Sequence, residues 1–64
     1  MRDVNRIKPI MEEMTKMWEK HPDMRLGQFM CNILGQVDSQ FNRDPFYVED
    51  DEFIEMIKEI PWLQ

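Results

Sequence analysis

Three stretches of this sequence repeat their apolar residues with the period of an α-helix. The clearest stripe has six members at offsets 0, 3, 4, 7, 8 and 11, namely Leu26, Phe29, Met30, Ile33, Leu34 and Val37. One stripe precedes it (Ile7, Ile10, Met11, Met14, Met17 and Trp18), and one follows it (Phe53, Met56, Ile57 and Ile60). The pattern predicts an all-α fold, a three-helix bundle over about 5–20, 24–36 and 50–60.

Proline and glycine mark the expected helix ends. Pro9 falls within about the first turn and a half of the first helix, where we expect some irregularity. Pro22 ends that helix, because the residue before a proline is disfavoured in the α region. Gly35 offers an early end to the second helix, and Pro61 closes the third. Side-chain caps are available at Asp3 or Asn5 for the first helix and at Asp23 for the second.

Aromatic residues also lie outside the three stripes. The segment 38–48 is polar at first and then carries Phe41, Phe46 and Tyr47, which are too many rings for a small domain to leave in water. We therefore expect a structured loop that lies against the bundle before the third helix. Trp62 and Leu63, beyond the last stripe, either fold back onto the bundle, which we favour, or form a docking tail.

The chain is 64 residues long, and no linker or repeat divides it, so we expect one domain over 1–64. A chain of this mass exposes roughly 4,400 Å² when folded, against roughly 11,500 Å² unfolded, and so buries about 60% of its surface. Such a thin core does not favour a rigid, enclosed active site. We expect a binding module, a regulator or a subunit, and no enzyme.

The single cysteine, Cys31, rules out an internal disulfide and a four-cysteine zinc site, and it favours a cytosolic location. We expect Cys31 to be a small buried side chain, and no catalytic pair with the lone His21. The segment 38–49 has the length of a calcium-binding loop, but Arg43 stands where the sharp turn needs glycine. No membrane span is expected, and neither metal nor cofactor is implied.

Charge is unevenly distributed along the chain, whose net charge is −5. Residues 1–32 carry six basic and five acidic side chains, whereas residues 33–64 carry two basic and eight acidic ones. The acidic run Glu49, Asp50, Asp51 and Glu52 suits a helix N-terminus, and it is also a candidate docking patch for a basic protein surface.

A row of small residues, Gly27, Cys31 and Gly35, is spaced by four within the second helix. Each glycine costs a helix roughly 1 kcal/mol relative to alanine, so the row indicates that another backbone needs the space. Close packing within the chain is one explanation, and a dimer contact is the other. We expect a symmetric homodimer through this helix or through the methionines of the first helix, Met11, Met14 and Met17, although these also suit the core.

Several blocks of the sequence are distinctive: Met1-Arg2-Asp3 with Asn5-Arg6-Ile7, Trp18, Pro22-Asp23 with Arg25-Leu26-Gly27-Gln28, and Asp44-Pro45-Phe46-Tyr47-Val48-Glu49-Asp50-Asp51-Glu52-Phe53. They cover most of the chain and resemble a group of short uncharacterised bacterial and phage-borne proteins. The resemblance implies a stand-alone small protein and carries no activity or site residue with it.

Two functional hypotheses follow from these observations. The first is a small cytosolic protein-interaction or regulatory factor, related to phage proteins by the resemblance, that occupies the surface of an unidentified protein partner. The alternative is a weak nucleic-acid-binding module that uses the basic residues of the N-terminal region, which are Arg2, Arg6, Lys8, Lys16, Lys20 and Arg25. The acidic balance of the whole chain disfavours this alternative, because phosphates need a basic face.

Overall fold

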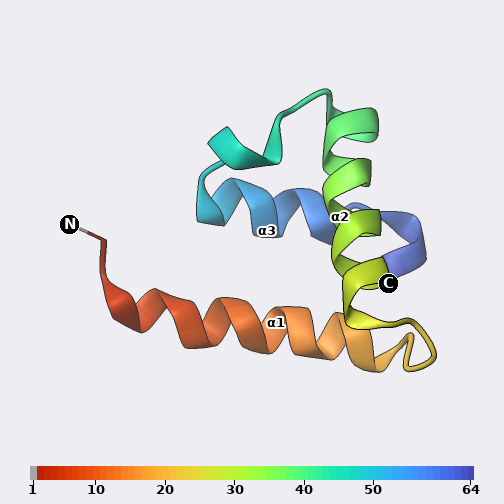
Figure 1. Cartoon of the computed structure of the whole chain (residues 1–64). Helices are drawn as coiled ribbons and strands as arrows, with labels where there is room; N and C mark the ends of the chain where they lie inside the picture. The colour runs from red at the N-terminus through yellow and green to blue at the C-terminus, as the bar shows by residue number, and fades with distance from the viewer. Residues whose placement is uncertain (1) are drawn as a thin grey trace.

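The computed structural model describes residues 2–64, which form three α-helices joined by short turns (Figure 1). The helices are α1 (Ile7–Glu19), α2 (Leu26–Phe41) and α3 (Asp50–Lys58), and short 3-10 helices occur before α1 at Val4–Arg6, between α2 and α3 at Pro45–Tyr47, and after α3 at Pro61–Leu63. The all-α, three-helix fold expected from the apolar stripes is confirmed.

The start of α1 has the irregularity expected around Pro9. Asp3 accepts a hydrogen bond from the backbone N–H of Asn5 at 3.0 Å and so begins the Val4–Arg6 turn, which leads directly into α1. Pro9 is the third residue of α1, where the backbone N–H has no partner inside the helix in any case. The proline therefore fits without breaking a hydrogen bond of the helix.

Both ends of α2 differ from the prediction. Asp23 does not cap the helix; instead, Gln28 accepts a hydrogen bond from the backbone N–H of Arg25 at 2.9 Å. Gly35 does not end the helix early either, because α2 continues to Phe41 and stops where Asn42 takes a left-handed conformation, with φ 55° and ψ 42°. Burial of Val37 and partial burial of Phe41 on the core side offset the cost of the glycine.

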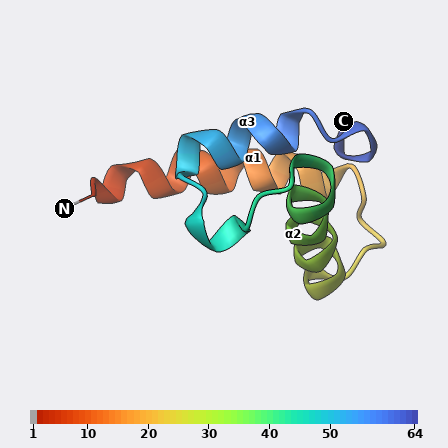
Figure 2. The ribbon, with the colours of Figure 1, turned by 90° about the horizontal axis from the view of Figure 1, so that it is seen from above.

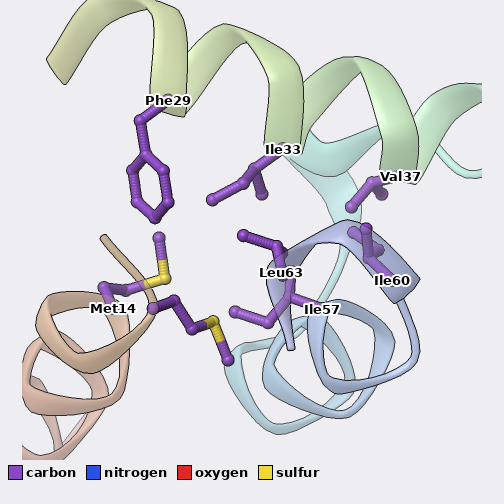
Figure 3. Packing of buried hydrophobic residues seen from close by; sticks show 8 residues of the cluster. Met14, Phe29, Ile33, Val37, Ile57, Ile60 and Leu63 are labelled. Atoms are coloured by element: carbon purple, nitrogen blue, oxygen red, sulfur yellow. The ribbon is translucent and has the colours of Figure 1, made fainter. Parts of the chain in front are cut away.

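The core joins all three helices and the C-terminal turn (Figure 3). Its buried members are Met14 and Met17 of α1, Phe29, Ile33 and Val37 of α2, Ile57 of α3, and Ile60 and Leu63 beyond it. The C-terminal segment folds back as expected, with Leu63 fully buried and Trp62 packed against the cluster. The Gln64 side chain then donates hydrogen bonds to the carbonyls of Ile57 and Ile60 at 3.2 Å.

The expectation for the loop before α3 is wrong for two of its three rings. Phe41 packs against the core, but Phe46 and Tyr47 are 83% and 75% exposed. Asp44 accepts a hydrogen bond from the backbone N–H of Phe46 and so fixes a tight turn, in which the two rings meet edge to face with centroids 4.9 Å apart. The two rings therefore contact each other and stay largely exposed to solvent, and they do not pack on the core.

α1 and α3 run in roughly the same direction, and α2 crosses both near their C-terminal ends (Figure 1). A view from above shows that the N-terminal end of α1 extends beyond the start of α3 (Figure 2). The molecule is accordingly elongated, with extents of 36 × 26 × 19 Å. The N-terminal half of α1 therefore lies outside the part of the bundle that α2 closes.

Candidate interaction surfaces

An open groove of about 660 Å³ separates the N-terminal half of α1 from α3. Its apolar lining consists of Pro9, Ile10 and Ile54. Ile10 lies four residues before the buried Met14, and Ile54 lies three residues before the buried Ile57. Each side chain therefore continues a core-facing stripe beyond the point where the core closes, so the two half-buried isoleucines line the groove. We call this surface the α1–α3 groove.

The rim of the α1–α3 groove is predominantly acidic. Two arginines and six carboxylates line it: Arg2, Arg6, Asp3, Glu13, Glu49, Asp50, Asp51 and Glu55. The lining thus carries a formal charge of −4. Lys16 lies 3.6 Å from Glu13 and Lys58 lies 3.9 Å from Glu55, one turn along each helix, so the formal charge around the groove is −2 when these two lysines are included.

Ion pairs between distant parts of the chain close one end of this groove. Arg2 lies 2.9 Å from Glu49, and Arg6 lies 2.6 Å from Asp50. The basic N-terminal segment and the acidic start of α3, which the sequence separates, are therefore neighbours in the fold. The four carboxylates of the expected acidic patch therefore do not act as one free surface. Glu49 and Asp50 pair with the N-terminal arginines, and Glu52 pairs with Arg43 at 2.9 Å. Asp51 is the one member without an ion pair within residues 2–64.

A second candidate surface is the α2 outer face, formed by Gly27, Cys31, Leu34 and Gly35. A Cβ atom added at either glycine would meet nothing within 4 Å, so the explanation of this row as close packing within the chain is wrong. Cys31 is exposed, contrary to the buried side chain that we expected. The reason is the position of each residue around the helix axis. Phe29, Ile33 and Val37 face the core, so the small residues lie on the opposite side of α2.

The four residues of the α2 outer face are uncharged, although Asp23 lines the hollow beside Gly27 and Cys31. No charged side chain occurs between Arg25 and Asp38, although 33% of the whole chain is charged. The side chain of Leu34 is 38% exposed and that of Leu26, at the start of the helix, is 55% exposed. The face therefore presents apolar and small side chains to its surroundings.

The methionines of α1 do not form one surface. Met14 and Met17 are only 7% and 6% exposed and belong to the core, while Met11 is 55% exposed. A dimer face made of all three is therefore wrong, and the core explanation holds for two of them. The spacing of these methionines favours the core explanation, but it does not show which of the three stays outside the core.

His21 and the segment 38–49 are the remaining residues that the sequence raised for catalysis or metal binding. The ring of His21 packs edge-on against Trp62, with centroids 5.5 Å apart, and its Nε2 atom is buried without a hydrogen-bond partner among residues 2–64. Asp38 lies within α2, so the segment 38–49 is not a continuous loop between helices. Within residues 2–64, no three side chains of the metal-ligating types come together, and no helix is long and apolar enough to span a membrane.

No protein-family model matches the chain, and neither a curated protein nor a solved structure matches it. The resemblance to short uncharacterised bacterial and phage-borne proteins therefore stays a prediction.

Proposed function

We propose that this protein is a small interaction factor that binds another protein through its helical surface. The observation that carries the proposal is the amount of surface that the fold leaves uncovered. The chain exposes 4960 Å², whereas a compact monomer of this mass exposes roughly 4,400 Å². Large apolar side chains contribute to the difference at seven positions, which are Val4, Ile7, Met11, Leu26, Leu34, Phe46 and Tyr47. Exposed apolar side chains that gather in one patch are typical of interaction sites, and Leu34 of this set belongs to the α2 outer face.

A protein partner suits these surfaces better than a nucleic acid does. Arg2 and Arg6 are engaged by carboxylates of α3, which lowers the positive potential that the N-terminal segment offers to phosphates. The groove beside them carries excess negative charge. The lone thiol of Cys31 fits the reducing cytosol, where we propose that the protein acts.

A second copy of the chain is the candidate partner for the α2 outer face. If two copies of α2 pair in antiparallel fashion about a two-fold axis near Cys31, Gly27 of one copy lies opposite Gly35 of the other. Arg25 at the start of one helix then comes close to Asp38 near the end of the other, so the charges that flank the face are complementary. The glycines would let the two backbones approach closely.

Capture from an extract of the cells that produce the protein tests the interaction role. The wild-type chain is compared with Cys31→Arg, which alters the α2 outer face, and with a groove variant, Asp51→Asn combined with Glu55→Gln. We expect a protein that is retained by the wild type in stoichiometric amount and lost from one of the two variants. Equal retention by all three chains, or no retained protein, would contradict the proposal.

Sedimentation equilibrium under reducing conditions tests the dimer. We expect the wild type to shift towards twice the monomer mass as its concentration rises, and Cys31→Arg to remain monomeric with unchanged helicity. Gln40→Arg is the matched control, since it adds the same charge to α2 three residues after the buried Val37 and away from the small-residue row. A wild type that stays monomeric into the hundred-micromolar range removes the second copy as a partner.

A further inference from the structure

We infer that the α1–α3 groove is a docking site for a basic amphipathic helix of another protein. The inference rests on the proposed interaction role and names both the surface and the chemistry of the partner. Three observations support it. The groove has an apolar lining and an acidic rim, and none of the chain's own helices has the composition to fill it.

The apolar lining provides the hydrophobic part of the contact. Ile10 of α1 and Ile54 of α3 both line the groove, and Pro9 extends the lining along α1. Ile7, which is 46% exposed, lies three residues before Ile10 on the same side of α1, next to the residues that line the groove. A groove of 660 Å³ bounded by two helices has the size of a typical ligand site and the form that accepts the apolar stripe of a helix.

The rim determines the charge of the partner. Asp51 has no ion pair within the described part of the chain, and Glu13 and Glu55 have only loose pairs with lysines of their own helices. These carboxylates stand along both sides of the apolar lining. Lysine or arginine side chains that flank an apolar stripe would meet them, whereas a helix flanked by acidic residues would be repelled.

A second copy of this chain does not have the required chemistry. α1 carries two lysines against three glutamates, α2 carries no basic residue, and α3 carries one lysine against four carboxylates. None of its helices is a basic amphipathic helix. The occupant of the α1–α3 groove is therefore a different protein, even if the α2 outer face pairs with a second copy.

Titration of the full chain with three synthetic helical peptides tests the inference. The peptides share one apolar stripe at i, i+3, i+4 and i+7 and carry lysine and arginine, glutamate, or serine and glutamine on the polar side. We expect isothermal titration calorimetry at low salt to give an affinity for the basic peptide at least about tenfold higher than for the neutral one, and no binding of the acidic one. Raising the salt concentration should reduce the difference.

Two matched variants locate the binding. Asp51→Asn with Glu55→Gln removes two rim charges and should lower the affinity for the basic peptide by about tenfold. Glu12→Gln with Glu19→Gln removes two exposed charges of α1 outside the groove and should leave the affinity within about twofold. Circular dichroism confirms that each variant is folded.

The outcomes separate this inference from the proposed function. If the neutral peptide binds as tightly as the basic one, or if both double variants weaken binding equally, the inference is overturned. If no peptide binds while capture from the extract succeeds, the inference fails and the interaction role stands. If no peptide binds and the capture from the extract also fails, the inference and the interaction role are both rejected.

Discussion

At the scale of single residues, Gly27 and Gly35 are the unusual positions of α2, one turn before and one turn after Cys31. The structure leaves both glycines without a neighbour within 4 Å of a Cβ position. Inside a monomer they therefore contribute only their cost in helix propensity.

Replacing each glycine by alanine should stabilise the monomer. Gly27→Ala and Gly35→Ala are each expected to raise the free energy of unfolding by about 1 kcal/mol, because alanine is the better helix former and no atom obstructs the added methyl group. Urea denaturation at low protein concentration measures the change. The same substitutions should weaken a dimer that packs through this row, so a rise in stability that disappears at high concentration supports both conclusions. A loss of stability in the dilute monomer would show that the glycines are in contact within the chain.

At the scale of secondary-structure elements, helical periodicity predicted the number and order of the helices. It placed the end of α2 too early because the stripe was counted only to Val37, although Phe41 lies four residues further on the same side. It did not reveal that Phe46 and Tyr47 pair with each other in a turn, since turn geometry depends on the hydrogen bond from Phe46 to Asp44. Folding back of the C-terminal turn was correctly expected from the size of the tryptophan.

Leu63 tests the contribution of the C-terminal turn to the core. Its side chain is fully buried although it lies outside all three helices, so Leu63→Ala should lower the free energy of unfolding by about 2–5 kcal/mol. Tyr47→Ala is the control, because a side chain that is 75% exposed should change stability by less than about 0.5 kcal/mol. Thermal and urea unfolding measure both. Similar small losses for the two variants would mean that the turn does not belong to the folded core.

At the scale of the whole molecule, the fold brings together what the sequence separates. The two arginines of the N-terminal segment pair with carboxylates 44 and 47 residues away. The basic start of the chain and the acidic start of α3 are therefore in contact. The α1–α3 groove arises from the same arrangement, because α1 extends past the start of α3 (Figure 2). Pro9 and Ile10 of this extended part supply the apolar lining on the α1 side. No spacing rule could find this groove, since its two sides come from helices whose relative position is set by the core.

The central claim is that the chain closes its core alone and keeps the α1–α3 groove free for a basic helix. Amide hydrogen exchange, followed by NMR on the dilute chain with and without the basic peptide, tests both parts. The account predicts slow exchange at Ile33, Val37 and Ile57 in either state. It predicts fast exchange at Ile10 and Met11 in the free chain and clear slowing when the peptide is present. Fast exchange at the three core amides, or slowing confined to α2 when the peptide binds, would contradict it.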